Sequence, residues 1–481
     1  MRILGINALF HDPAAALVID GRTVAAAEEE RFSRRKHGKR PVPFSAWELP
    51  EQAAAWCLKR AGLRPQDLDA VAYSFDPSLA RPADSMGLDD PWDHLRLAYA
   101  REAPGFLGTA LPGLDPGLVR FVPHHMAHAA SSAFAAPGAE DSSVLVLDGR
   151  GERASHLAAH RTGDRLEALH AQELPHSLGL VYEELTEHLG FLRSSDEFKV
   201  MALASHGRPR MLPELRRHVY ATGDGGFHAT AVPWHELCPP RGPDEPWTQD
   251  HADAAASAQA ALEETLLDLV RWLHGKTHDS VLTLAGGVAL NCVANSRIAR
   301  EGPFSRVWVQ PAAGDAGTAL GGALLLAVGA GHEPEPMAGA DLGRDWSDAE
   351  LGAWLKTAAV PFERPADISA TVAQALADNA IVAWFQGRSE YGPRALGHRS
   401  LLAHPGHAGN LERLNDVKGP RAVPPCRPHG ARRPRARDLR RSDAQPVHAL
   451  RPRRGGRVAR ADPGRGARRR HGTDPDGRPG A

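Results

Sequence analysis

The chain has 481 residues, 42% of them apolar, and its 57 Lys and Arg nearly balance 58 Asp and Glu, for a formal net charge of -1. This composition is typical of a soluble globular protein long enough for two or three domains. No apolar run approaches the ~18 to 20 residues that a membrane span needs, and the apolar start of the chain is broken by Asn7 and closed by His11-Asp12-Pro13, unlike a signal peptide. We therefore expect a cytoplasmic protein with no membrane partner.

The four cysteines, Cys57, Cys238, Cys292 and Cys426, are far apart and form no CxxC pair. This spacing argues against a disulfide scaffold and against a thiolate metal site. Any metal ligands in this chain should be His, Asp or Glu.

The near-zero net charge of the whole chain is the sum of two segments of opposite charge, which meet near residue 420. Residues 420–481 contain 18 Arg and 5 Asp, a local net charge of +13, so the first 419 residues carry -14. The tail also lacks Phe, Trp, Tyr, Ile and Met, and it cannot bury enough apolar surface to order itself. Its composition predicts a disordered segment.

Up to residue 420, strand-like and helix-like segments alternate, which predicts an α/β fold. The first three strands, with a tip at Gly21, should form a β-meander. Residues 331–345 are rich in Gly and Pro and are typical of a linker. The pattern predicts strands at residues 2–8, 14–19, 23–28, 68–74, 143–147, 280–284, 306–310 and 381–385, and helices at 50–61, 253–272 and 368–379.

Three histidines stand close together in His124-His125-Met126-Ala127-His128. Positions four apart share one face of a helix, so His124 and His128 can offer two imidazole nitrogens to one divalent metal, and His125 points elsewhere. The alternative is that these are ordinary polar side chains of a chain with 25 histidines.

Two aspartates in glycine-rich turns strengthen the metal hypothesis. Asp148 opens Asp-Gly-Arg-Gly-Glu at the end of an apolar strand, and Asp315 stands in a second glycine-rich turn after the strand at 306–310. Both turns could be plain hairpin or loop turns. Two His plus these two Asp would make a mixed N/O site that suits iron(II), manganese or zinc.

Glycines follow several of the predicted strands. Gly286, Gly287 and Asn291 lie between a strand and a helix, where backbone can approach an adenosine or a phosphate and the amide can bond a base or ribose. The pattern is neither GxGxxG nor GxxxxGK[ST], and a packing role for the glycines is the alternative. Together with the two glycine-rich turns, it predicts nucleotide contacts at Gly149, Gly151, Gly286, Gly287, Asn291 and Gly314.

The segment from Gly387 to Ser400 carries Arg388, Arg394 and Arg399 in a Gly- and Ser-rich loop. Guanidinium groups in such a loop can capture phosphate or carboxylate bidentately. A solvated basic loop is the alternative.

Taken together, these segments resemble the carbamoyltransferase family that includes the nodulation-factor, cephamycin and tobramycin O-carbamoyltransferases. The resemblance covers roughly residues 1–419 and rests on five motifs in order: Gly5 to Ala16 with His11, His124 to His128, Asp148 to Glu152, Gly286 to Asn291 with Gly314 to Gly322, and Gly387 to Ser400. It implies an actin/hexokinase-like (ASKHA), two-lobed α/β domain followed by a YrdC-like domain. In such enzymes, ATP and carbamoyl phosphate form carbamoyladenylate with release of pyrophosphate, and the carbamoyl group then moves to a hydroxyl.

The resemblance also implies roles for single residues. The metal set would be His124, His128, Asp148 and Asp315, with iron(II) as the metal. His11 would be a catalytic group that polarises or deprotonates the acceptor hydroxyl, and His125 a second catalytic residue. Arg388, Arg394, Arg399 and Lys418 would contact carbamoyl phosphate or the adenylate. The partner would be a small molecule with a hydroxyl group.

The chain departs from the family pattern in two places. Phe198 to Ala204 stands where the family has Gly-Lys-Val-Met-Gly-Leu-Ala, and the family's Arg-Glu-x-x-Arg-Pro-x-Ala-Pro stretch does not follow Gly419. The tail composition is typical of out-of-frame translation of GC-rich DNA, so we hypothesise a frame shift near codons 419–421. An uninterrupted genomic read would refute it. The expected domains are 1–345 (transfer), 346–419 (incomplete YrdC-like) and 420–481 (tail).

Other hypotheses about the function remain open at this point. A metal-dependent ATP hydrolase or kinase of the same fold would turn over ATP without carbamoyl phosphate. A catalytically impaired nucleotide-binding protein could use the basic tail on nucleic acid, but that partner is disfavoured because the tail lacks stacking aromatics. The acceptor and the oligomeric state, including a homodimer, are undecided.

Overall fold

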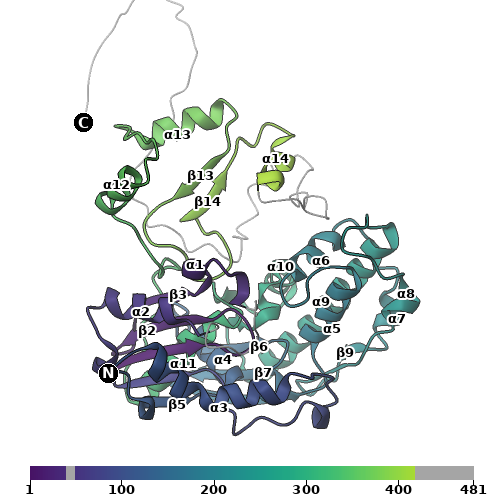
Figure 1. Cartoon of the computed structure of the whole chain (residues 1–481). Helices are drawn as coiled ribbons and strands as arrows, with labels where there is room; N and C mark the ends of the chain where they lie inside the picture. Colours follow the sequence, from purple (N-terminus) through teal and green to yellow (C-terminus); the bar gives the residue numbers. More distant parts are fainter. Residues whose placement is uncertain (39–48, 418–481) are drawn as a thin grey trace, which may run out of the picture. The chain divides into compact units, whose positions relative to one another are not determined.

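The computed structural model describes residues 1–38 and 49–417 (Figure 1). The expectation for the Arg-rich tail and the predicted role of Lys418 therefore lie outside the described residues. Within the described ranges, no helix combines the length and the apolarity needed to cross a bilayer.

Two five-stranded sheets have the same topology. The first has the order β3-β2-β1-β4-β5 and the second the order β12-β11-β6-β7-β8. In each sheet, the first three strands along the chain are antiparallel neighbours, and the last two add in parallel. The strands are β1 (Arg2–Asn7), β2 (Ala14–Ile19), β3 (Arg22–Glu28), β4 (Ala70–Tyr73), β5 (Val119–Phe121), β6 (Asp141–Leu147), β7 (Ala154–Thr162), β8 (Arg165–Glu173), β11 (Val281–Ala285) and β12 (Arg306–Val309).

This repetition confirms the α/β class, and it is the duplicated unit that a two-lobed ASKHA-like fold requires. Two shorter pairs complete the described strands: β9 (Val219–Ala221) with β10 (Phe227–Ala229), and β13 (Val382–Phe385) with β14 (Arg399–Leu402). The predicted meander is present as β1, β2 and β3.

The α-helices of the described residues are α1 (Glu30–Ser33), α2 (Glu51–Arg60), α3 (Asp93–Ala110), α4 (His124–Ala133), α5 (Leu178–His188), α6 (Glu197–Ala204), α7 (Leu212–Leu215), α8 (Trp234–Leu237), α9 (Gln249–Thr277), α10 (Cys292–Glu301), α11 (Ala316–Gly329), α12 (Asp348–Thr357), α13 (Ile368–Ala377) and α14 (Asn410–Val417). The helices predicted at 50–61, 253–272 and 368–379 correspond to α2, α9 and α13. The segment that departs from the family's Gly-rich motif forms α6.

Helices α4 and α11 lie between the two sheets (Figure 1). Small residues allow this close approach: a Cβ on Gly321 would lie 1.8 Å from the carbonyl oxygen of Ala127, and one on Gly5 would lie 1.7 Å from that of Ala319. One face of α4 packs with Val144 and Val146 of β6. The alanine- and glycine-rich sequences therefore bring the starts of both helices to the centre of the fold.

The predicted second domain is joined to the first by a buried tyrosine. Tyr391 is fully buried among residues of β1, β2 and α11, and its hydroxyl donates to the carbonyl of Ala316. Gly392 N–H donates to Glu28 Oε1 over 2.8 Å. The predicted boundary at residue 345 stays a prediction, and residues 389–392 pack as part of the first core.

Candidate metal centre

The two histidines of the HxxxH pattern lie on the first turns of α4. The helix begins at His124, directly after Pro123. His124 and His128 are four residues apart and share one face, as the spacing predicts. Their exposed fractions are 1% and 0%.

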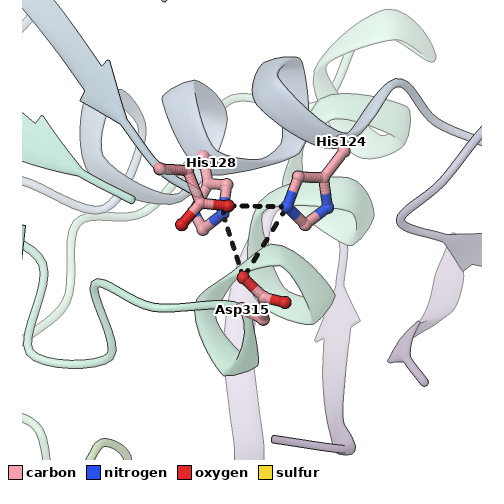
Figure 2. Close-up of side chains that lie close together, drawn as sticks. His124, His128 and Asp315 are labelled. Atoms are coloured by element: carbon pink, nitrogen blue, oxygen red, sulfur yellow. Dashed lines mark hydrogen bonds and ion pairs between the residues drawn. The ribbon is translucent and has the colours of Figure 1, made fainter. Parts of the chain in front are cut away.

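Asp148 and Asp315 reach these histidines from two different elements. Asp148 follows β6, the central strand of the second sheet, and Asp315 directly precedes α11. His124 Nε2 lies 3.7 Å from Asp315 Oδ1, and His128 Nε2 lies 3.6 Å from the same oxygen (Figure 2). Asp148 Oδ2 lies 3.3 Å from His124 Nε2 and 3.6 Å from His128 Nε2. The structure thus brings together all four residues of the predicted metal set.

The spacing of the four atoms fits a metal ion. Ligands about 2.0 to 2.2 Å from a tetrahedral metal lie roughly 3.3 to 3.6 Å from one another. Within the described part of the chain, both ring nitrogens of His128 and both carboxylate oxygens of Asp315 are buried without a hydrogen-bond partner. Buried polar atoms are costly when unpaired, and a cation shared by these groups would satisfy them. The donor set therefore fits a divalent metal; its identity is open.

The charges at this centre are mutually dependent. Burial raises the pKa of Asp148, but the neighbouring imidazoles of His124 and His128 outweigh burial and hold that pKa well below 3.8. Burial lowers the pKa of His124, yet Asp148 and Asp315 raise it well above 6.5. In the absence of metal, a proton on His124 balances part of the carboxylate charge.

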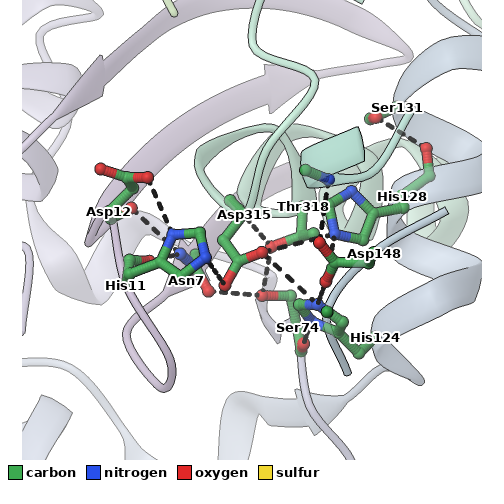
Figure 3. A network of polar contacts seen from close by, with 12 residues as sticks. Asn7, His11, Asp12, Ser74, His124, His128, Ser131, Asp148, Asp315 and Thr318 are labelled. Carbon is green, nitrogen blue, oxygen red and sulfur yellow. Dashed lines mark hydrogen bonds and ion pairs between the residues drawn. The ribbon is translucent and has the colours of Figure 1, made fainter. Parts of the chain in front are cut away.

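His11 lies beside this cluster, in the turn after β1. Its Nε2 is 3.6 Å from Asp315 Oδ2, and its Nδ1 is 2.8 Å from Asp12 Oδ2 (Figure 3). The other oxygen of Asp12 is 2.6 Å from His37 Nδ1. The amide of Asn7 donates to the carbonyls of His11 and Asp12 and so holds the turn. The pairing of Asp12 with His37 was not predicted, because 25 residues separate them.

His125 is not a member of the cluster formed by His124, His128, Asp148 and Asp315. The residue is 6% exposed, and neither ring nitrogen has a hydrogen-bond partner among the described residues. Burial, followed by the charge of His124, lowers its pKa to about 3. A Cβ on Gly151 would lie 2.6 Å from its Nδ1, so this glycine leaves room for the ring. His125 is therefore a neutral imidazole at physiological pH.

Glu152 ends the Asp-Gly-Arg-Gly-Glu motif, and the sequence predicts no role at this position. Its Oε1 accepts hydrogen bonds from the backbone N–H groups of His124, at 2.8 Å, and Asp76, at 2.9 Å. This carboxylate caps the first turn of α4 and so orients the helix that carries both histidines. The signal available in the sequence was an acidic residue four positions after Asp148.

The predicted nucleotide loop borders the same centre. Gly286 has φ +90°, and a Cβ there would lie 2.1 Å from the carbonyl oxygen of Leu147. Gly287 N–H donates to Asp148 Oδ1 over 2.8 Å. Both glycines thus have packing and bonding roles toward the second sheet, and their predicted contact with a nucleotide is untested.

Asn291 caps α10 and is engaged by a neighbouring amide. Its side-chain oxygen accepts from Ala294 N–H at 3.1 Å, and its NH₂ donates to Gln259 Oε1 at 2.8 Å. Gly149 directly follows Asp148 in the sequence, and Gly314 directly precedes Asp315. A bond from Asn291 to base or ribose stays a prediction, as do nucleotide contacts at Gly149, Gly151 and Gly314.

The three described arginines of the predicted anion loop differ in their partners. Arg388 donates to the backbone carbonyls of Gly343, Val24 and Leu342. Arg399 pairs with the buried Glu390 over 2.8 Å. One guanidinium nitrogen of Arg394 donates a hydrogen bond to the carbonyl oxygen of Leu290, at 2.9 Å; Leu290 belongs to the predicted nucleotide loop. Arg394 therefore keeps the most donor capacity for an anion.

These observations define an α/β protein whose two repeated sheets enclose a buried site of two histidines and two aspartates. The chain matches the family model for the carbamoyltransferase N-terminus over residues 2–80 and 111–324, and the model for the carbamoyltransferase C-terminus over residues 373–446. It belongs to the carbamoyltransferase family. The second match extends past Gly419, where we placed the break in the family pattern, so the end of family similarity does not coincide with that position.

Several curated proteins resemble the chain along most of its length. It is 37% identical to nodulation protein NolNO of Sinorhizobium fredii, covering 85% of this chain and 61% of that protein. An uncharacterized protein of Synechocystis is 36% identical over 84% of this chain and 71% of its own length. The 3'-hydroxymethylcephem-O-carbamoyltransferase of Streptomyces clavuligerus is 27% identical over 85% and 74%.

Solved structures give more distant likenesses. The ROK hexokinase of Thermus thermophilus aligns with a TM-score of 0.33 at 15% identity, covering 68% of this chain and 98% of that chain. HypF of T. kodakarensis aligns with a TM-score of 0.35 at 14% identity, covering 69% and 48%.

Proposed function

We propose that this protein transfers a carbamoyl group, activated as carbamoyladenylate, to a hydroxyl of a small molecule. The observation that carries the proposal is the buried His124, His128, Asp148 and Asp315 cluster with His11 beside it, in a chain of the carbamoyltransferase family. The relatives named for cephem carbamoylation support a small-molecule acceptor.

The first step would be activation. Water first cleaves carbamoyl phosphate to carbamate and inorganic phosphate. A carbamate oxygen then attacks the α-phosphorus of ATP, the bond from that phosphorus to the pyrophosphate oxygen breaks, and carbamoyladenylate and pyrophosphate result. Arg394 is the residue best suited to hold an anionic group in this step, because one of its nitrogens reaches the Gly286–Asn291 loop while its others stay available. Arg388 and Arg399 would act indirectly, since both are bonded to protein groups.

The second step would be transfer. The acceptor oxygen attacks the carbamoyl carbon, the bond from that carbon to the AMP oxygen breaks, and the hydroxyl proton moves to His11 Nε2. Asp12 accepts from the other ring nitrogen of His11, which leaves Nε2 as the proton acceptor. His125, neutral and buried near Gly151, would bond the substrate rather than carry charge.

A divalent metal at the cluster would neutralise phosphate charge on the departing AMP. Iron(II) is our first choice of metal, and manganese and zinc suit the same donors. Burial of the four ligands keeps water from competing for the reactive anhydride. The glycines of the predicted nucleotide set would let the backbone approach the phosphates.

The test separates the two half-reactions. Purified protein is assayed for pyrophosphate release from ATP with and without carbamoyl phosphate, and for transfer of labelled carbamoyl to a panel of sugar, aminoglycoside and hydroxymethyl-cephem acceptors, with iron(II) present. We expect carbamoyl-phosphate-dependent release. His128→Ala should abolish transfer and leave pyrophosphate release intact, whereas the exposed His235→Ala should change neither.

ATP turnover at the same rate with and without carbamoyl phosphate would instead favour the hypothesis that the protein is a hydrolase or kinase. If the folded protein releases no pyrophosphate from ATP, this chain does not carry out the activation step. In that case, supplied carbamoyladenylate would still reveal the transfer step on its own.

A further inference from the structure

One segment beside the metal centre lies outside the family pattern. The N-terminal family model matches residues 2–80 and 111–324 and omits residues 81–110. This segment contains Asp90 and α3, and it lies against the turn that carries Asp148 and Glu152. Its backbone touches that turn directly, because Arg81 N–H reaches the carbonyl of Glu152 at 3.4 Å.

Asp90 joins the segment to the metal-site turn by an ion pair. Its Oδ2 accepts from Arg96 at 2.8 Å and also from Arg150, which lies between Asp148 and Glu152. Its Oδ1 accepts from Trp92 N–H at 3.0 Å. One carboxylate therefore holds two guanidinium groups, only one of which comes from its own segment.

The same cluster reaches the metal centre by a second route. The guanidinium carbons of Arg96 and Arg150 both lie 5.2 Å from the centre of the Phe10 ring. Phe10 in turn meets the ring of His124 edge-on, with 5.5 Å between centroids. Asp90 is thus linked to the metal ligands through Arg150 and the turn, and through Phe10 and His124.

The cluster is charged and closely packed. Burial raises the pKa of Asp90, but Arg150 and Arg96 hold it at about 2. A cavity of about 10 Å³ borders Phe10, Arg96, Arg150 and Glu152, which is room for about one water molecule. The side chains of Asp90, Arg96 and Arg150 are only 11 to 16% exposed, so little water can solvate the two guanidinium groups when the carboxylate charge is removed.

We propose that Asp90 is a positioning residue for the metal centre: by holding Arg150 and Arg96 on Phe10, it sets the turn that carries Asp148 and Glu152 against His124. The inference uses the metal-binding part of the proposed function and is independent of carbamoyl chemistry. Groups that hydrogen-bond a metal ligand typically change metal affinity about 10- to 100-fold when they are removed. Asp90 acts through Arg150 and Phe10 rather than on a ligand directly, so we expect an effect at the low end of this range.

The experiment measures Co²⁺ binding and the visible ligand-field spectrum of the bound ion in the full chain. Asp90→Asn is compared with Asp93→Asn, a matched control on the same segment. Asp93 pairs with Arg96 at 3.2 Å and accepts from Ala83 N–H, and among the described residues it makes no ion pair with Arg150. Asp90→Glu serves as the conservative rescue, and thermal unfolding of each variant without metal reports any general loss of stability.

We expect Asp90→Asn to weaken Co²⁺ binding about tenfold and to shift the spectrum, with Asp93→Asn within twofold of the wild type and Asp90→Glu recovering part of the affinity. Equal Co²⁺ affinities and spectra for the wild type and both Asn variants would overturn the inference. So would equal losses in both Asn variants, since that result means a structural role only. A wild-type protein that binds no Co²⁺ would overturn the metal centre itself, and this inference with it.

Discussion

Glu152 Oε1 accepts a hydrogen bond from the backbone N–H of His124 over 2.8 Å, so one carboxylate of the Asp148–Glu152 turn caps the helix that supplies both histidines. The other carboxylate of that turn, Asp148, faces the side chains of the same histidines. A single tight turn therefore sets both the direction of α4 and the charge that its histidines meet.

This cap predicts a graded loss of stability. Glu152→Ala removes the acceptor for two backbone donors, and we expect the free energy of unfolding to fall by about 2 kcal/mol. Glu152→Gln keeps an acceptor oxygen and should lose less. Urea denaturation of the metal-free proteins measures both. Equal effects of Ala and Gln would mean that the charge, and not the hydrogen bonds, stabilises this end of α4.

Metal binding should release a proton near pH 7. Although burial lowers the pKa of His124, Asp148 and Asp315 raise it well above 6.5, so the metal-free site holds a proton that the ion must displace. Calorimetric titration with Zn²⁺ in two buffers of different ionisation enthalpy gives the number released, and we expect about one. His125→Asn is the control, because His125 is already neutral. A buffer-independent heat would contradict the coupling.

His125 should make the metal-free protein less stable in acid. Burial, followed by the charge of His124, lowers the pKa of His125 from 6.5 to about 3. Between these two pH values, His125 is therefore protonated in the unfolded chain but neutral in the folded chain. Its contribution is complete above pH 6.5 and is lost as the pH falls toward 3, with a slope of up to about 1.4 kcal/mol per pH unit. Comparing unfolding of the wild type and His125→Asn between pH 7 and 5 isolates this slope; parallel curves would exclude it.

Gly392 should tolerate no side chain. It has φ +115°, and a Cβ there would lie 2.3 Å from the carbonyl oxygen of Pro311. We expect Gly392→Ala to lower the free energy of unfolding by about 3 kcal/mol or more. Gly397 is the matched control, since it has φ +107° with nothing within 4 Å of a new Cβ. Gly397→Ala should cost only the backbone strain, about 1 kcal/mol. Similar losses at both sites would show that the close packing at Pro311 relaxes freely.

Substitutions of two arginines in the same loop should have different effects: one should lower stability, and the other should weaken anion binding. Arg399 neutralises Glu390, which is 1% exposed, so Arg399→Ala should destabilise the protein by about 3 kcal/mol. Arg394 makes a single bond to the Leu290 carbonyl, so Arg394→Ala should leave stability within about 0.5 kcal/mol and raise the KM for carbamoyl phosphate in pyrophosphate release. Denaturation and initial-rate kinetics on both variants test the contrast. If Arg394→Ala leaves the KM unchanged, Arg394 is not the anion contact.

The local parts of this site could be predicted from the sequence. The spacing of His124 and His128 places both on one helical face, because the helical repeat depends only on near neighbours. Asp148 and Asp315 could be predicted because apolar strands precede both, and the ends of strands in such sheets face a common region. The resemblance to carbamoyltransferases, read from motifs in their order, gave the family that the comparisons confirm.

Other features were decided by the tertiary structure. The pairing of Asp12 with His37 and the cap made by Glu152 join segments far apart in the chain, and no local pattern specifies them. The same holds for the arginines: Arg388, Arg394 and Arg399 look alike in the sequence, yet packing gives them carbonyl, loop and carboxylate partners. The sequence by itself determined which side chains can carry charge or bind metal. Which of them face one another was decided by the folding of α4 and α11 between the two sheets, because the partner of a polar group depends on every element packed around it.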